Sequence, residues 1–165
     1  MLILGIDPGI AITGYGLVDK TGKDSFSLVA FGCIKTSAKD SFPQRIFSIY
    51  RQTKYLVSRY QPDKIAIENV YFAKNVKTAI DVGQARGVIM LAVSQNKAKL
   101  GEFTPLQVKI ALTGYGRASK LQVQEMVKKV LHLPEIPKPD DAADALALAI
   151  TYGQTMDFKR ETCNM

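Results

Sequence analysis

Residues 1–16, MLILGIDPGIAITGYG, decide the fold that the sequence predicts. Residues 2–6 form a continuous apolar run, which is typical of a strand buried on both faces at the centre of a sheet. Asp7 ends the run, and a Pro-Gly turn follows it. Residues 13–18 return to an extended pattern, so we expect the two strands to pair as a hairpin. This arrangement brings one carboxylate to the rim of the sheet.

Two interpretations of Asp7 stay open at this point. An aspartate before Pro-Gly commonly bonds nearby backbone amides in a turn. A carboxylate that ends a buried strand can also be a metal ligand or a phosphate-site acid, because its burial is costly unless something pairs it. The two interpretations differ in whether other acids reach the same rim.

Length and composition indicate one globular domain. The chain has 165 residues, of which 47% are hydrophobic and 22% charged, and these values are unlike those of disordered or membrane proteins. We expect the domain to span residues 1–153, with a frayed tail over residues 154–165. No long apolar segment or secretory signal is present, which predicts a cytoplasmic protein with no membrane contact. The two cysteines are far apart in the sequence and have no zinc-site spacing.

The charge balance favours a polyanionic partner. Twenty-two Lys and Arg residues against fifteen Asp and Glu residues leave a net charge of +7. Nucleic acid is the first candidate for such a basic chain, although a modest surplus can also serve solubility alone. The surplus becomes informative if the acids gather in one place.

The rest of the chain alternates strands and helices. We expect strands at residues 27–35, 64–69 and 102–104, and helices at residues 42–61, 76–96, 105–112, 120–131 and 140–152. The strand at 64–69 follows a helix, so a right-handed crossover would place it parallel to the first strand. The carboxyl ends of parallel strands share one rim, which places Glu68 beside Asp7.

A stripe of small residues interrupts the helix predicted at residues 76–96. Ala79, Gly83 and Gly87 recur at four-residue spacing, where another helix can approach closely. Glycine in a helix interior is unfavourable, so a packing reason is needed. The face could pack on the sheet of the same chain or on a second subunit, and both alternatives stay open.

Three acids open the last helix. Asp140, Asp141 and Asp144 lie in its first turns, where acids oppose the helix dipole favourably, and we assign this ordinary role to Asp140. Asp144 is flanked by Ala and Leu residues, so its carboxylate needs a partner. Asp144 can share a helix face with either of the other two, and spacing alone does not choose between them.

If this helix begins at the strand rim, its acids join Asp7 and Glu68 in one cluster. Four close carboxylates cannot all ionise unless some keep protons or a cation neutralises them. Oxygen ligands without nearby His or Cys favour hard cations, Mg²⁺ or Mn²⁺. Two such ions can activate water and stabilise the leaving oxygen in phosphodiester hydrolysis.

Four separated blocks of sequence resemble the RuvC-type Holliday junction resolvases. They are GIDPG with TGYG, AIENVYFAKN, GQARG and DDAADALALAI, and the resemblance extends to about residue 152. It implies an α/β, RNase H-like fold with a five-stranded mixed sheet flanked by helices on both faces. It also implies a homodimer that cuts opposing strands of a four-way DNA junction symmetrically with Mg²⁺, leaving ligatable nicks, and that can work beside a branch-migration motor.

The resemblance assigns roles to individual residues. Asp7, Glu68, Asp141 and Asp144 match the four metal-binding catalytic acids of the family, and Asp140 remains a possible substitute ligand. Some members have His at the position of Asp141.

The DNA contacts implied by the resemblance lie mainly in two regions. Tyr71 and Phe72 match aromatic residues that enter the open centre of the junction, where base stacking contributes about 1 to 3 kcal/mol per base. Which of the two rings stacks is left open. Lys109 and Lys120 match lysines that meet DNA in the family. Apart from the resemblance, Lys74, Lys77, Arg86 and Arg117 could add phosphate contacts, although a single surface lysine is more often simply solvated.

Three alternatives remain at this stage. An actin-like or sugar-kinase ATPase also carries an acid and glycines in its first hairpin, but it needs two such domains around its nucleotide. A non-catalytic junction-binding protein would not need four converging acids. Another RNase H-like nuclease could share the acids and differ in its substrate.

Overall fold

The computed structural model describes the backbone of residues 1–69 and 76–162, and the side chains of residues 1–69 and 79–155. A five-stranded mixed sheet has the order β3-β2-β1-β4-β5. β1 is antiparallel to β2 and parallel to β4, and the outer pairs are β2/β3 antiparallel and β4/β5 parallel. The elements are β1 (Leu2–Asp7), β2 (Ile12–Lys20), β3 (Phe26–Lys35), α1 (Phe42–Tyr60), β4 (Lys64–Glu68), α2 (Val76–Ser94), β5 (Lys99–Phe103), α3 (Pro105–Thr113), α4 (Lys120–Val130) and α5 (Asp140–Thr162).

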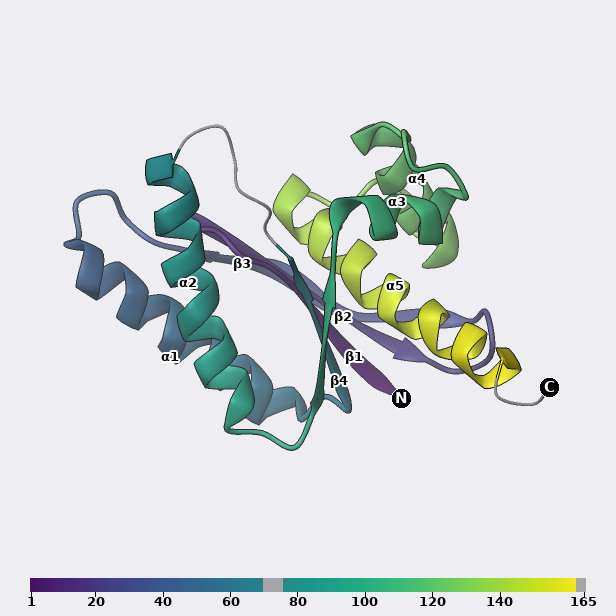
Figure 1. Ribbon diagram of the computed structural model, residues 1–165, viewed down its shortest axis with the longest axis horizontal. Helices are drawn as coiled ribbons and strands as arrows, with labels where there is room; N and C mark the ends of the chain where they lie inside the picture. The colour runs from purple at the N-terminus through teal and green to yellow at the C-terminus, as the bar shows by residue number, and fades with distance from the viewer. Residues whose placement is uncertain (70–75, 163–165) are drawn as a thin grey trace.

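The sheet separates two layers of helices (Figure 1). α1 and α2 cover one face, and their buried side chains form one core cluster with Leu4, Ile6 and Ile67. α5 lies across the other face, with α3 and α4 packed outside it. The predicted arrangement, a five-stranded mixed sheet with helices on both faces, is confirmed.

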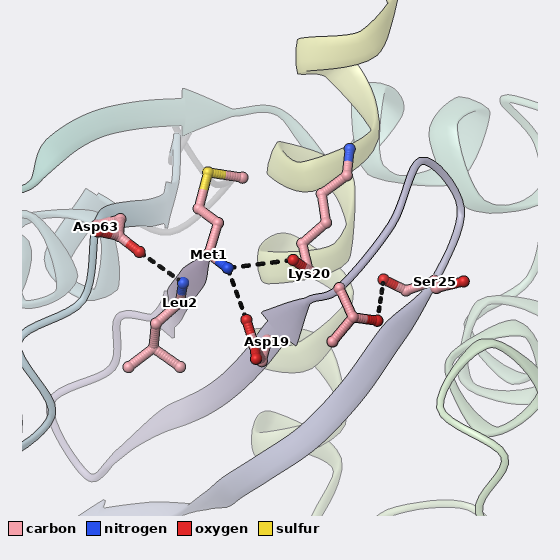
Figure 2. A network of polar contacts seen from close by, with 7 residues as sticks. Met1, Leu2, Asp19, Lys20, Ser25 and Asp63 are labelled. Atoms are coloured by element: carbon pink, nitrogen blue, oxygen red, sulfur yellow. Dashed lines mark hydrogen bonds and ion pairs between the residues drawn. The ribbon is translucent and has the colours of Figure 1, made fainter.

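The first strand is anchored at the end opposite to Asp7, as Figure 2 shows. The amino group of Met1 donates to Asp19 Oδ1 at 2.7 Å and to the carbonyl oxygen of Lys20 at 3.1 Å. The Leu2 N–H donates to Asp63 Oδ2 at 2.7 Å, and the Asp63 N–H donates to the Leu2 carbonyl at 2.9 Å. These bonds tie β1 to both neighbouring segments and set the register that continues to the rim where β1 ends at Asp7.

α5 is buried because it lies between the sheet and the α3–α4 pair. Apart from Asp144, every residue from 142 to 151 is buried. Gly5 and Gly14 allow the close approach of this helix to β1 and β2. A Cβ at Gly5 would overlap the carbonyl oxygen of Ala145, and one at Gly14 would overlap that of Asp141. The small residues of the strands therefore decide how near α5 comes to the sheet.

Capping boxes start α3 and α4, whose predicted first residues are confirmed. Gln107 N–H donates to Thr104 Oγ1 at 3.1 Å while its side chain accepts from the Thr104 N–H at 2.8 Å. Ser119 and Gln122 repeat the pattern at the start of α4. These caps fix where α4 begins, and hence where Lys120 lies.

Two element bounds differ by three residues or more from those predicted, and the others agree within two residues. β5 begins at Lys99, three residues earlier than expected, because it pairs along the whole of β4. α5 continues to Thr162, beyond the end expected near residue 152. Gly153 does not stop the helix; a Cβ there would crowd the Phe26 ring, and its carbonyl accepts from Lys20 Nζ at 2.6 Å. The division of the chain into a domain at residues 1–153 and a frayed tail at residues 154–165 remains a prediction.

The small-residue face of α2 does not pack on the sheet of the same chain. A Cβ added at Gly83 or at Gly87 would meet no heavy atom within 4 Å. Ile80 and Leu91 on the same side of the helix are 55% and 54% exposed. Of the two alternatives for this face, packing on the chain's own sheet is therefore excluded. Within residues 1–69 and 76–162, no helix is long and apolar enough to cross a membrane.

Candidate active site

Asp7 and Glu68 end adjacent parallel strands. Ile6 pairs with Ile67, so the next residues of β1 and β4 lie at the same level of the sheet. Side chains alternate between faces along a strand. Ile6 and Ile67 pack in the α1–α2 core, so the carboxylates that follow them are directed to the face covered by α5. The predicted juxtaposition of these two acids is confirmed.

The surroundings of Asp7 oppose its ionisation. Burial, and then the charges of Glu68, Asp144 and Asp141, raise the pKa of Asp7 to about 8, against a smaller lowering by Lys120. At neutral pH without a bound cation, Asp7 therefore keeps a proton. This is the behaviour expected when carboxylates converge, and it favours the interpretation of Asp7 as a site acid.

Glu68 is raised in pKa by the same causes. Burial is the largest, followed by the charge of Asp144, while a hydrogen bond with Asp7 and the charge of Lys120 lower it. The protonated Asp7 carboxyl is the donor in that hydrogen bond. The two strand acids thus share one proton at the rim.

Asp144 enters the site from the second turn of α5. Burial raises its pKa above the ordinary value, and its hydrogen bond and charge interaction with Lys120 oppose the rise. Lys120 Nζ lies 2.8 Å from Asp144 Oδ2. The partner that the sequence required for this half-buried carboxylate is thus a lysine at the first position of α4.

Asp141 and Asp140 differ in position as the resemblance implied. Asp141 is half-buried, and its charge acts on Asp7, Cys33 and Asp144. Asp140 is exposed and lies 3.4 Å from Lys120 Nζ. Asp141 therefore belongs to the cluster, whereas Asp140 stands at its edge.

Lys120 is the cation of this acidic cluster. Although burial opposes it, the hydrogen bond with Asp144 and the nearby charges of Asp144 and Asp140 raise its pKa. The ammonium is half exposed, with 53% of the side chain accessible, so solvent and DNA can reach it. The sequence predicted a DNA contact for Lys120 and did not predict its pairing with the acids.

A cavity of about 210 Å³ opens beside the acids, between α3, α4 and α5. Its polar lining comes from Glu68, Asp144, Lys109 and Lys120. Its remaining lining is apolar and comes from the same three helices, including Pro105 at the start of α3. The structure thus brings Lys109 and Lys120 to the same place as the carboxylates.

The donor set fits a hard divalent cation. All four acids supply oxygen ligands, which Mg²⁺ and Mn²⁺ prefer. As the described side chains are placed, no three His, Cys, Asp or Glu residues lie in an arrangement that could hold a metal ion, so the acids must move to bind one. Metal binding here would require Asp7 to lose its proton and Lys120 to release Asp144. The proton on Asp7 and the ammonium of Lys120 therefore offset the negative charge of the acids that a bound metal would otherwise neutralise.

The other predicted DNA-contact residues fall into three groups. Arg117 is exposed in the segment between α3 and α4. Arg86 is half-buried and engaged with Glu68 and Glu102. The remaining predictions lie outside the described residues or side chains: Tyr71, Phe72 and Lys74 are in the segment 70–75, and Lys77 is in α2 but its side chain is not described.

Sequence reasoning missed two kinds of residue that shape the site. The glycines of β1 and β2 set the distance of α5, and the clue was their position in strands, where glycine is unfavourable without a packing reason. Arg86 was interpreted as a phosphate contact because a lone basic residue in a helix carries no signal of its partner.

Comparisons with known proteins identify relatives along nearly the whole chain. The family model for "Crossover junction endodeoxyribonuclease RuvC" matches residues 3–152. A protein of that name from Halothermothrix orenii is 52% identical over 161 residues, covering 98% of this chain and 97% of the relative. One from Caldicellulosiruptor saccharolyticus is 51% identical over 152 residues, covering 92% of each.

Solved structures give the same result. Thermus thermophilus RuvC in complex with a Holliday junction substrate is similar, with a TM-score of 0.89 and 34% identity, covering 94% of this chain and 96% of that one. A yeast mitochondrial Holliday junction resolvase shares the fold alone, with a TM-score of 0.72 and 15% identity over 98% of this chain and 82% of that one. With an RNase H-like fold and close relatives along nearly its whole length, this chain belongs to the RuvC family of crossover junction endodeoxyribonucleases, which are metal-dependent nucleases.

Proposed function

We propose that this chain resolves four-way DNA junctions by paired, symmetric nicks in opposing strands. The observation that carries the proposal is the convergence of Asp7, Glu68, Asp141 and Asp144 at one rim of a chain with a net charge of +7. A relative with 34% identity was solved with a Holliday junction substrate, which supports this choice of substrate. We further propose that the enzyme acts in the cytoplasm and can accompany a branch-migration motor.

The four acids would hold Mg²⁺, with Mn²⁺ as a substitute, and two ions per site suit the number of carboxylates. Such ions lower the pKa of water and stabilise the leaving oxygen of the scissile phosphodiester. Water then adds to phosphorus and the bond to the 3′ oxygen breaks, which leaves a 5′ phosphate and a 3′ hydroxyl. Asp140 lies at the edge of the cluster and is the substitute ligand of this proposal.

The basic residues around the acids would bind the DNA backbone. Lys109 and Lys120 line the cavity beside the carboxylates, so they can contact phosphates next to the scissile bond. Lys120 Nζ, which lies 2.8 Å from Asp144 Oδ2, would be available to a phosphate wherever Asp144 served as a metal ligand. Arg117 between the same two helices extends this positive surface.

Symmetric cutting requires two active sites, and we propose that a homodimer supplies them through the face of α2. Gly83 and Gly87 are open to another helix, and Ile80 and Leu91 add exposed apolar area at either end. A second copy of this face would supply the packing reason that the exposed glycines lack within one chain. The isologous contact of two such helices gives the two-fold symmetry that paired nicks require.

Tyr71 and Phe72 would open the junction centre by stacking on its bases, and this part of the proposal lies outside the described residues. Replacing each ring by Ala should reduce cutting through weaker base unstacking. Fluorescence of 2-aminopurine at the crossover measures that step directly.

The decisive experiment compares the parent and Asp7→Asn on a synthetic mobile four-way junction, with Mg²⁺ and with EDTA. We expect paired nicks from the parent with Mg²⁺ only, and junction binding without nicks from Asp7→Asn, because a ligand is lost while the basic surface remains. Equal cutting by both proteins would contradict the metal site. An RNA/DNA hybrid tested in parallel separates this function from that of another RNase H-like nuclease, and binding without nicks by the parent would favour a non-catalytic junction-binding protein.

A further inference from the structure

Arg86 connects three elements behind the catalytic rim. Its Nε donates to the carbonyl oxygen of Glu68 at 3.3 Å, and its terminal nitrogen lies 2.5 Å from Glu102 Oε2. Glu68 ends β4, Glu102 belongs to β5, and Arg86 belongs to α2. The Arg86 guanidinium therefore connects helix α2 to two strands, to β4 through the backbone of Glu68 and to β5 through the side chain of Glu102.

This contact lies on the opposite face of the sheet from the acids. Glu102 pairs with Ile67, whose side chain is buried in the α1–α2 core, so Glu102 is directed to that same face. The Glu68 carboxylate follows the opposite alternation and lines the cavity beside α3 and α5. Arg86 thus binds the backbone of Glu68 on the α1–α2 face of the sheet, while the Glu68 carboxylate lies on the opposite face, at the cavity.

The end of β4 needs such support. The chain leaves the sheet after Glu68, and the Asn69 N–H donates to the Phe103 carbonyl at 2.8 Å as the last bond of the β4–β5 ladder. The Glu68 carbonyl accepts from Arg86 at 3.3 Å, a long bond for an N–H donor, whereas the 2.5 Å ion pair with Glu102 is the close contact that holds the guanidinium in place. Only 21% of the Arg86 side chain is exposed, so the surrounding residues also limit its movement. Its α2 neighbours Ala85 and Ile89 are fully buried against the core, which fixes the base of the side chain.

We propose that Arg86 is a positioning residue for the nuclease reaction, which holds the Glu68 backbone between α2 and β5 so that its carboxylate is set for the metal. The inference rests on the proposed role of Glu68 as a metal ligand. It differs from the phosphate contact that the sequence suggested for Arg86. It also places this support on the helix whose Gly83–Gly87 face we assign to the dimer.

The test uses Arg86→Gln, Arg86→Lys, Glu102→Gln and the double variant, with Arg51→Gln as a matched control for loss of one exposed positive charge on α1. Three quantities are measured for the full chain: junction affinity in EDTA, Mn²⁺ affinity without DNA by calorimetry, and the single-turnover cutting rate at saturating protein. The melting temperature is recorded for each protein.

We expect Arg86→Gln to bind the junction like the parent, while its cutting rate and Mn²⁺ affinity fall by about 10-fold to 100-fold, as is typical when support for a metal ligand is removed. Glu102→Gln should show smaller decreases in cutting rate and in Mn²⁺ affinity. The double variant should be no worse than Arg86→Gln, because both changes break one connection. Arg86→Lys should recover part of the loss, since an ammonium cannot hold both partners, and Arg51→Gln should match the parent.

Two results would overturn the inference. One is weaker junction binding by Arg86→Gln with normal Mn²⁺ affinity and normal cutting at saturation, which is the signature of a phosphate contact. The other is parental Mn²⁺ affinity and cutting in Glu102→Gln, which tests the connection even where Arg86→Gln unfolds. Failure of the underlying function is recognised separately, since the parent itself would then neither bind Mn²⁺ nor nick the junction.

Discussion

Asp7 is the acid whose ionisation the fold opposes most strongly. Its pKa is raised to about 8 by burial and by the charges of three other carboxylates, of which Glu68 has the largest effect. Strand register and helix approach bring these groups together at a buried rim. Burial and mutual repulsion both oppose ionisation there, and a divalent cation can relieve the repulsion.

This repulsion predicts how stability depends on pH without metal. The folded Asp7 binds a proton that the unfolded chain releases near pH 4, so its contribution to the free energy of unfolding is greatest below pH 4 and falls as pH rises to about 8. Asp7→Asn should remove this dependence. Urea unfolding in EDTA should therefore show a larger gain in midpoint for the variant at pH 8 than at pH 5, and parallel curves for the two proteins would contradict the shared proton.

Lys120 pairs with Asp144, so it would compete with a metal ion for this carboxylate. Replacing it by Met should strengthen Mn²⁺ binding at pH 8.5 by roughly fivefold, because removing a unit charge at short range is worth about 1 kcal/mol in a mostly aqueous site. The same change should weaken junction binding, since a phosphate contact is lost. Calorimetry with Mn²⁺ and a gel-shift assay measure the two effects, and exposed Lys129→Met on the same helix is the control. Weaker Mn²⁺ binding by Lys120→Met would mean that the lysine organises the carboxylates.

The close contact of α5 with β1 and β2 depends on strand glycines. Gly14→Ala would force its Cβ into the backbone of Asp141, so α5 must move and the site acids must move with it. We expect a loss of about 1 to 3 kcal/mol in the free energy of unfolding, the usual cost of overpacking, together with reduced cutting.

The control for this prediction is Gly22→Ala in the turn between β2 and β3. A Cβ at Gly22 would lie at an ordinary 3.4 Å from Ser25 Cβ, so this variant should unfold and cut like the parent. Urea titration and a junction-cutting assay on both variants provide the comparison. Equal stability of Gly14→Ala and Gly22→Ala would show that α5 can shift without cost.

The α2 face links the single chain to the proposed dimer. An exposed glycine within a helix is less favourable than alanine by about 0.5 to 1 kcal/mol, and this chain keeps two of them at four-residue spacing. Gly87→Ala should therefore stabilise the isolated chain while weakening self-association. The larger Gly87→Leu should separate the subunits further.

Sedimentation velocity over a range of concentrations measures this effect, and urea unfolding of the same samples measures the helix contribution. Ser58→Ala, at an exposed position of α1, is the control for a helix substitution away from this face and should sediment like the parent. A Gly87→Leu variant that associates as strongly as the parent would exclude this face as the interface. Because one active site can nick one strand at a time, the separated subunits should also lose simultaneous nicking of opposing strands.

The sequence by itself determined the order of elements, the β1–β2 hairpin, the parallel β1–β4 pair and the acids that each element carries. These features follow from local patterns: apolar runs, capping boxes such as Thr104 with Gln107, and the rule that parallel strands share a carboxyl rim. The tertiary structure alone decided the pairing of Lys120 with Asp144, the connection made by Arg86, and the exposure of Gly83 and Gly87. Such features depend on which distant segments meet in space, and a side chain carries no local sign of its long-range partner. The length of α5 belongs to the same class, because glycine is unfavourable within a helix, whereas here the absence of a side chain at Gly153 makes room for Phe26.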